Sequence, residues 1–310
     1  MKIIFLGTSV FSAYILEKLV ESEHQIVAVI SQPNRLVGRK KEIKLTSVAK
    51  YAQEKELTLF QPEKIIDIYN EIEKLEFDIL ITAAYGQILP EKFLNLSSLI
   101  PLNVHGSLLP KYRGPSPIQT AILNGDEKTG ITIMEMIKKM DAGRIIKQEE
   151  IQIEKFENTG DIFIKLQKIG SDLLLDVLDD FSNQKFNLQD QNIEEVTYTY
   201  MLSREDEKID LNETVEAIHN KVRAMQPYSA AYMYFNQKEM KVIKTKVLNY
   251  EIIYNIGEII SIEKDGIVVQ CKDGQLLIEE IQFAGKKILP AYDYFQNFKN
   301  KKIFFEVKND

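Results

Sequence analysis

Residues 1–106 alternate between short apolar runs and longer segments with helical spacing, and this alternation constrains the fold more than any other feature. The apolar runs are rich in Ile, Val and Leu, which is typical of strands buried on both faces of a parallel sheet. Strands that alternate with helices form a sheet whose faces those helices cover. The sequence therefore predicts an α/β, Rossmann-like parallel-sheet domain, with strands at 2–7, 25–31, 77–86 and 100–106 and helices at 10–22, 46–55 and 63–75.

The carboxyl ends of the predicted strands are where a ligand site is expected, because open α/β sheets bind ligands at that edge. Gly7, the pair Tyr85–Gly86 and the residues 103–105 lie at these ends. A dinucleotide cofactor has little support, since Gly7 is followed by Thr8 and Ser9 and the G-x-G-x-x-G fingerprint is missing.

A second pattern begins beyond residue 184. Helical spacing at 159–181 ends the first part, residues 185–203 are rich in Asn and Gln, and a further helix is predicted at 211–225. Five short strands follow, with Asp-Gly turns between some of them. We therefore expect a catalytic domain at 1–184, a linker at 185–203 and a carboxyl-terminal OB-like β-barrel domain at 204–310.

Composition excludes several other classes of protein. Cys271 is the only cysteine, so no internal disulfide can form, and the three histidines have no neighbours at metal-ligand spacing. No run approaches the roughly 18 apolar residues of a membrane span. We expect a soluble, cytoplasmic protein with no metal ion and no membrane partner.

One short segment is strongly basic although the net charge of the chain is -7. In RLVGRKKEIK a single glutamate stands among basic residues, which are Arg35, Arg39, Lys40, Lys41 and Lys44. A solvated surface loop is the usual interpretation of such a run, and binding to a phosphate backbone is the alternative.

A polar pair ends the predicted strand at 100–106. Asn103 and His105 are two residues apart, so their side chains share one face of the strand. Buried polar groups cost free energy unless they are paired, which makes such a pair unusual in an apolar strand. A satisfied structural histidine beside an asparagine turn remains the alternative.

The stretch at 103–143, which begins NVHGSLLP and ends KKMDAG, closely resembles the central signature of the folate-dependent formyltransferases. AAYGQILP at 83–90 resembles their pterin-binding segment. LSREDEKIDL at 202–211 and QFAGKK at 282–287 resemble the two-domain members, whose acceptor is the amine of methionyl initiator tRNA. The resemblance implies that 10-formyltetrahydrofolate is the formyl donor and that methionyl initiator tRNA is the partner.

The resemblance also implies a role for individual residues. Asn103, His105 and Asp141 match the catalytic residues of the family. The folate-binding positions are Tyr85, Gly86, Gln87, Ile88, Leu89, Pro90, Ser107, Leu108, Leu109 and Pro110. The basic segment at 35–44 matches the loop that contacts the tRNA acceptor end. Without the resemblance, Asp141 in Asp-Ala-Gly would be interpreted as a turn residue.

Formyl transfer to an amine explains why these residue types are required. Attack on the formyl carbon places negative charge on oxygen, to which an Asn103 amide can donate. His105 can carry the proton from the amine toward the leaving folate nitrogen. Asp141 can hold the imidazole in one tautomer and stabilise its cation.

Three positions depart from the family pattern, namely Ser9, Val10 and Arg144. None removes a catalytic group. Two alternatives stay open: a formyltransferase acting on an amino sugar nucleotide, and a non-catalytic RNA-binding or folate-sensing protein. We expect a monomer.

Overall fold

The computed structural model describes residues 1–37, 42–299 and 301–306. By compactness the chain divides into two units that interleave in sequence. The first contains Met1–Pro117, Thr129–Ile151 and Phe163–Tyr200, and the second contains Ile118–Lys128, Gln152–Ile162 and Met201–Asp310. The second unit thus includes two short segments from before residue 184. The consecutive domain boundaries expected from the sequence stay a prediction.

The first unit is built on a seven-stranded sheet with the order β5-β2-β1-β6-β7-β8-β9. Its strands are β1 (Lys2–Gly7), β2 (Gln25–Ile30), β5 (Leu59–Phe60), β6 (Ile79–Ala83), β7 (Leu102–His105), β8 (Lys128–Glu135) and β9 (Ile145–Gln152). The pairs from β5 to β7 are parallel, as predicted for the strands β2, β1, β6 and β7, whereas the short strand β5 was not expected. However, β8 runs antiparallel to β7, so the sheet is mixed. Antiparallel strands at the edge of an otherwise parallel sheet are common.

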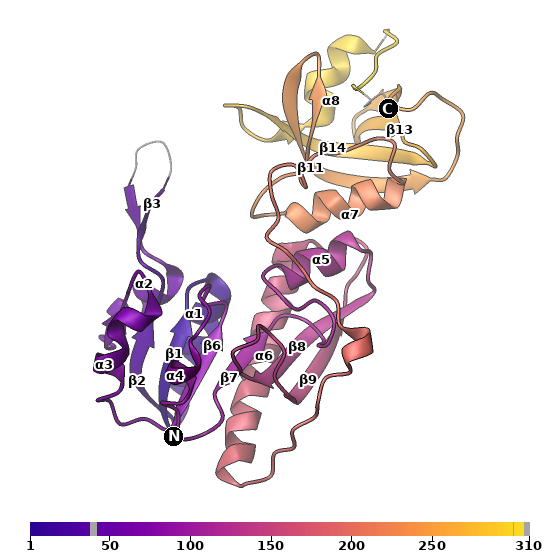
Figure 1. The fold of residues 1–310 in the computed structure, drawn as a ribbon. Coiled ribbons are helices and arrows are strands. Elements are labelled where there is room, and N and C mark those ends of the chain that lie inside the picture. Colours follow the sequence, from indigo (N-terminus) through magenta and orange to yellow (C-terminus); the bar gives the residue numbers. More distant parts are fainter. Residues whose placement is uncertain (38–41, 300, 307–310) are drawn as a thin grey trace. The chain divides into compact units, whose positions relative to one another are not determined.

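Helices pack on this sheet (Figure 1). They are α1 (Val10–Glu21), α2 (Ser47–Glu54), α3 (Tyr69–Ile72), α4 (Glu91–Leu94) and α6 (Thr159–Ser182), with a 3-10 turn at Ile65–Ile68. Ser9 caps α1, because its hydroxyl accepts a hydrogen bond from the amide of Ser12. The departure from the family pattern at Ser9 therefore supplies a helix cap.

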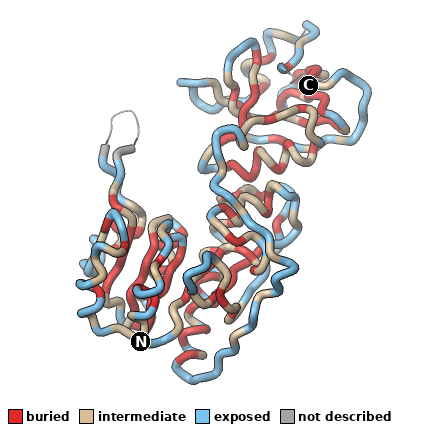
Figure 2. Tube along the Cα trace, in the orientation of Figure 1, coloured by how far each residue is buried: buried red, intermediate tan, exposed pale blue. Residues whose placement is uncertain are grey.

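Figure 2 shows buried residues along the strands of the sheet, and they include every residue of β6. Continuous burial of this kind fits a strand that is covered on both faces. It also places the polar Thr82, which is 4% exposed, within the core. Thr82 lies opposite Asn103 in the register of β6 and β7.

The two ends of the basic segment at 35–44 form the strands of a hairpin, β3 (Arg35–Val37) and β4 (Glu42–Lys44). In its register Arg35 lies opposite Lys44. The sequence predicted a loop here, whereas the two ends of the segment are paired strands. Arg39, Lys40 and Lys41 lie outside the described residues.

The second unit combines α5 (Pro117–Leu123) and α7 (Val215–Met225) with an antiparallel sheet of the order β10-β11-β14-β13-β12. These strands are β10 (Tyr232–Phe235), β11 (Lys238–Asn249), β12 (Ile259–Glu263), β13 (Gly266–Gln270) and β14 (Gln275–Phe283), and β15 (Leu289–Pro290) pairs with β14. Helix α8 (Ala291–Phe295) and a 3-10 turn at Gln296–Phe298 follow. The predicted α/β domain followed by a small β domain is confirmed.

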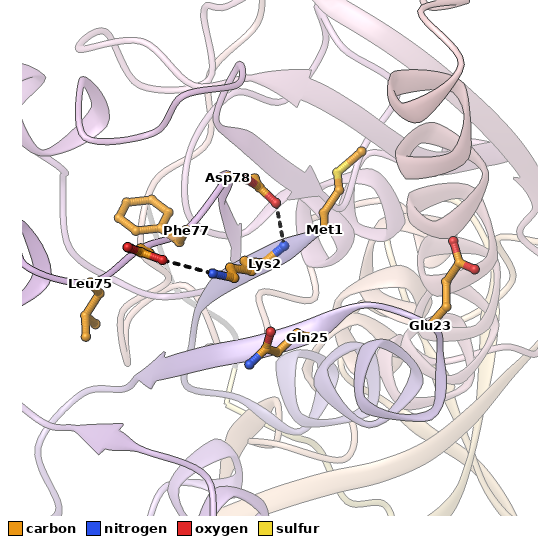
Figure 3. Close-up of a pocket in the computed structure, with 8 residues that line it drawn as sticks. Met1, Lys2, Glu23, Gln25, Leu75, Phe77 and Asp78 are labelled. Atoms are coloured by element: carbon orange, nitrogen blue, oxygen red, sulfur yellow. Dashed lines mark hydrogen bonds and ion pairs between the residues drawn. The ribbon is translucent and has the colours of Figure 1, made fainter.

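The amino-terminal edge of the first sheet carries an open hollow of about 670 Å³, lined by residues that include Met1, Gln25 and Asp78 (Figure 3). There the Lys2 amide donates to the Asp78 carboxylate at 2.6 Å. This hollow lies at the start of β1, whereas ligands of α/β sheets bind where the strands end. We therefore place the candidate site at the other edge. No helix within the described ranges is both long and apolar enough to cross a membrane.

Candidate active site

Three polar side chains meet at the carboxyl end of β7. The Asn103 amide nitrogen lies 3.5 Å from Asp141 Oδ1. His105 Nδ1 lies 3.7 Å from the same oxygen, and the two side chains are only 7% and 13% exposed. The structure therefore brings together Asn103, His105 and Asp141, which the sequence resemblance had grouped.

Asp141 and Thr82 together orient the Asn103 amide. A carboxylate only accepts, so the NH₂ end of the amide faces Asp141, and on the other side the Thr82 hydroxyl donates to Asn103 Oδ1 at 2.7 Å. The opposite orientation would set the amide oxygen against a carboxylate oxygen. Sequence reasoning missed Thr82, although a lone hydroxyl in the apolar strand ILITA was a signal that could have found it.

The Tyr112 carbonyl orients the His105 ring. Because a carbonyl only accepts, His105 Nε2 carries a proton and donates it to Tyr112 O at 2.9 Å. In the neutral ring, Nδ1 is then the bare nitrogen, and it faces Asp141. The tautomer is therefore set by a backbone carbonyl rather than by the aspartate, and a proton taken up at Nδ1 would lie beside a carboxylate.

Asp141 lies in the loop between β8 and β9 with a φ of 49°. Non-glycine residues rarely adopt this left-handed conformation, and aspartate tolerates it better than most. The Gly114 amide donates to Asp141 Oδ2 at 2.8 Å. The carboxylate is thus held on one oxygen by a backbone donor, while the other faces Asn103 and His105.

An ion pair closes the base of this loop. Arg144 Nε lies 2.7 Å from Glu135 Oε2, and Nη2 lies 2.9 Å from Oε1. Hydrogen bonding to Arg144 lowers the pKa of Glu135. The departure from the family pattern at Arg144 therefore pairs with a carboxylate at the end of β8.

The proposed folate segment at 85–90 begins shortly after β6, with Ala84 between them. The Tyr85 carbonyl accepts from Thr8 Oγ1 at 2.8 Å, and burial raises the pKa of the Tyr85 hydroxyl to about 12. The Gln87 side chain accepts from the Ile65 amide at 2.9 Å. Leu89 is buried, whereas Ile88 is 64% exposed and offers an apolar contact at the surface.

The second proposed folate segment, 107–110, is built around Thr132. Its hydroxyl donates to the Ser107 carbonyl at 2.6 Å and accepts from the Leu109 amide at 3.1 Å. Ser107 is fully buried, and its own hydroxyl donates to the Lys111 carbonyl. The loop that follows β7 is therefore fixed by its own contacts.

Two of the five proposed tRNA-binding residues can be placed. Arg35 and Lys44 are both exposed on the β3–β4 hairpin. Arg35 makes two contacts with the Glu63 carboxylate, at 2.8 and 3.3 Å.

The expected linker carries contacts that sequence reasoning did not foresee. Thr197 Oγ1 accepts from the Tyr112 amide at 2.8 Å, and the Thr199 amide donates to the Arg113 carbonyl at 2.7 Å. This segment therefore pairs with the loop whose carbonyl orients His105. A run of polar residues looks the same in sequence whether it is solvated or bonded to backbone groups.

Comparisons with known proteins agree with this geometry. Residues 1–178 match the family described as formyl transferase, and residues 201–299 match the formyl transferase C-terminal domain. The methionyl-tRNA formyltransferase of Mesoplasma florum is 44% identical over 96% of this chain and 95% of its own length. That of Mycoplasma capricolum subsp. capricolum is 45% identical, with the same coverage.

A solved structure has a similar fold. It is an N-formyltransferase from Helicobacter canadensis in complex with folinic acid and dTDP-3-aminofucose. It has a TM-score of 0.66 and 21% identity, and the match covers 90% of this chain and 98% of that one. At this identity the likeness concerns the fold. The 44% and 45% identity to the first two relatives, over nearly their whole length, shows the family: this chain belongs to the methionyl-tRNA formyltransferase family.

Proposed function

We propose that this protein transfers the formyl group of 10-formyltetrahydrofolate to the free amino group of methionyl initiator tRNA, and so supports the initiation of protein synthesis. The observation that carries the proposal is the meeting of Asn103, His105 and Asp141 at the carboxyl end of β7. The full-length similarity to methionyl-tRNA formyltransferases supports the choice of acceptor.

The segments at 85–90 and 107–110 are the proposed folate site. Both follow strands of the parallel part of the sheet, at the edge where α/β sheets bind ligands. The exposed side chain of Ile88 suits contact with a flat ring, and Gly86 has a φ of 92° that shapes the turn. When bound there, the folate supplies the formyl carbon that the amine attacks.

Asn103 is the proposed donor to the developing oxyanion. Asp141 and Thr82 hold its amide with the NH₂ group toward the site, so the donor needs no reorientation as charge develops. Preorganised donors of this kind are among the largest contributions to acyl-transfer catalysis.

His105 is the proposed carrier of the proton. Its Nε2 proton is engaged by the Tyr112 carbonyl, so Nδ1 is the nitrogen that can take a proton from the attacking amine and pass it to the leaving nitrogen. Asp141 stabilises the imidazolium formed in between, from 3.7 Å away.

The β3–β4 hairpin, which carries Arg35 and Lys44, and the basic residues Arg39, Lys40 and Lys41 that follow β3 in the sequence are the proposed contact with the tRNA. Clustered lysine and arginine side chains on an acidic chain suit a phosphate backbone. A monomeric state and a cytoplasmic location stay predictions from the sequence.

Formylation rates of single variants test the roles in this site. Asn103→Ala should lower kcat by about 10² to 10³, and His105→Ala should lower it at least as far. Asn187→Ala, at an exposed position, is the matched control and should leave kcat unchanged. Folded Asn103→Ala and His105→Ala enzymes with near wild-type rates would show that the assignment is wrong.

A further inference from the structure

The Gln191 side chain donates two hydrogen bonds to the loop that carries Asp141. Its Nε2 group donates to the Asp141 carbonyl at 2.9 Å and to the Gly143 carbonyl at 2.7 Å. We propose that Gln191 is a positioning residue that holds Asp141 against Asn103 and His105 for formyl transfer. This inference rests on the function proposed above.

Arg113 fixes the orientation of the Gln191 amide. Its Nε and Nη2 groups donate to Gln191 Oε1 at 3.0 and 2.8 Å. A guanidinium has only donors, so the amide oxygen must face it and the NH₂ group must face the two carbonyls. Arg113 is 5% exposed, which keeps water from competing for these bonds.

The hydrogen bonds form a closed ring around the catalytic carboxylate. Gln191 holds the backbone of Asp141, Arg113 holds Gln191, and the next residue, Gly114, donates to Asp141 Oδ2. On the other side of Arg113, the carbonyl of Tyr112 orients His105. One side chain therefore ties together the two segments that place His105 and Asp141.

The backbone conformation of Asp141 explains why the loop needs hydrogen bonds that hold it in place. A φ of 49° is unfavourable for a residue other than glycine, and it persists only where the surroundings enforce it. Position 114 also requires glycine. An added Cβ would lie 2.6 Å from the Thr199 carbonyl oxygen, so the segment at 189–200 could not pack this closely against Gly114. Both features depend on the close packing of this segment on the active-site loops.

Gln191→Glu separates positioning from general stability. The carboxylate keeps Arg113 as its partner, now as an ion pair, but it cannot donate to the carbonyls of Asp141 and Gly143. Misplacement of a catalytic group by about 1 Å can cost about 10² in rate. We therefore expect kcat to fall by about 10- to 100-fold, with both KM values within about twofold of wild type.

Gln189→Glu is the matched control. Gln189 is exposed, and its backbone pairs with Ile145 in both directions, two residues before Gln191. The same change of charge on the same segment should leave kcat unchanged. A fall in kcat as large as that of Gln191→Glu would attribute the effect to charge and overturn the proposal.

A double-mutant cycle shows whether Gln191 acts through Asp141. If it does, adding Gln191→Glu to Asp141→Asn should cost little further activity, because the group to be positioned is already missing. If the losses of activity caused by Gln191→Glu and Asp141→Asn multiplied in the double variant, the inference would be contradicted.

Hydrogen exchange of the Gly114 amide supplies a readout that does not need formyl transfer. This amide is bonded to Asp141 Oδ2, so it should exchange faster in Gln191→Glu and at the wild-type rate in Gln189→Glu. Unchanged exchange in Gln191→Glu would overturn the positioning role. A wild-type protein that formylates no methionyl-tRNA would overturn the proposed function instead, so the two failures can be told apart.

Discussion

At the scale of single residues, the hydrogen bond from Thr82 to Asn103 should contribute to the rate of formyl transfer, and removing one oxygen tests this. Thr82→Val replaces the hydroxyl by a methyl group of similar size and leaves Asn103 Oδ1 without its donor. The Asn103 amide is then held only from the Asp141 side, through its 3.5 Å contact with Oδ1. We expect kcat to fall by about tenfold, as for loss of a modest orienting hydrogen bond of about 1.4 kcal/mol, in steady-state formylation assays.

Thr129 provides the matched control for Thr82. Its buried hydroxyl has no hydrogen-bond partner among the described residues. Thr129→Val removes an unsatisfied polar group, so it should keep the wild-type kcat and a thermal midpoint that is equal or higher. Thr82→Val with a wild-type kcat would rule out the orienting role.

Sequence reasoning found some of these residues and could not find others. Asn103 and His105 stand out because a period of two puts both on one face of a strand. Asp141 became a candidate only through resemblance, since its left-handed turn is also ordinary Asp-Ala-Gly chemistry. Thr82 and Gln191 act through strand register and long-range hydrogen bonds, which no local pattern records.

At the scale of elements, the β3–β4 hairpin is where RNA binding should respond to charge. Glu63 engages Arg35 in the free protein. Glu63→Gln should release Arg35, tighten tRNA binding and steepen its dependence on salt. Arg35→Gln with Lys44→Gln should weaken binding and reduce the salt slope by about one for each phosphate that is no longer neutralised.

A salt series of tRNA affinities checks these changes. Lys74→Gln, which removes an exposed charge shortly before β6, is the control and should leave the slope unchanged. Equal affinities for wild type, Glu63→Gln and the double variant across the series would contradict an RNA-binding hairpin. Folate binding should be the same in all of them.

Element prediction succeeded where the hydrophobic period was long and regular. The helices at α1, α2, α6 and α7 begin and end within a few residues of the predicted ranges. Strand β9 was missed because most of its residues are at least partly exposed and show no alternation. The helix expected at 63–75 is a 3-10 turn followed by a four-residue helix.

At the scale of the whole molecule, His219 should make stability depend on pH. Burial is the main cause that lowers its pKa below the ordinary 6.5, and Arg223 adds to the shift while Lys155, Glu216 and Glu279 oppose it. Below about pH 6.5 the unfolded chain takes up this proton before the folded one does, so the free energy of unfolding should fall as the pH drops.

Thermal unfolding measured from about pH 7.5 down to about pH 5.5 tests this sign. His219→Gln removes the titration, while its amide can still donate to the Lys155 carbonyl and accept from Thr245. Over this pH range the thermal midpoint of the wild-type protein should fall further than that of the variant. Parallel curves would contradict the prediction.

The identity of the acceptor is the central claim for the molecule as a whole. A fold shared with an N-formyltransferase of Helicobacter canadensis does not by itself distinguish a tRNA acceptor from an amino sugar nucleotide. Full-length similarity to methionyl-tRNA formyltransferases does favour the tRNA.

The most direct measurement incubates the wild-type protein with 10-formyltetrahydrofolate and either methionyl initiator tRNA or a dTDP-linked amino sugar. Mass spectrometry then identifies which amine carries the formyl group. We predict formylmethionyl-tRNA as the product, with rates that depend on Asn103 and His105. Formylation of the sugar alone, or binding of folate and tRNA without transfer, would contradict this prediction.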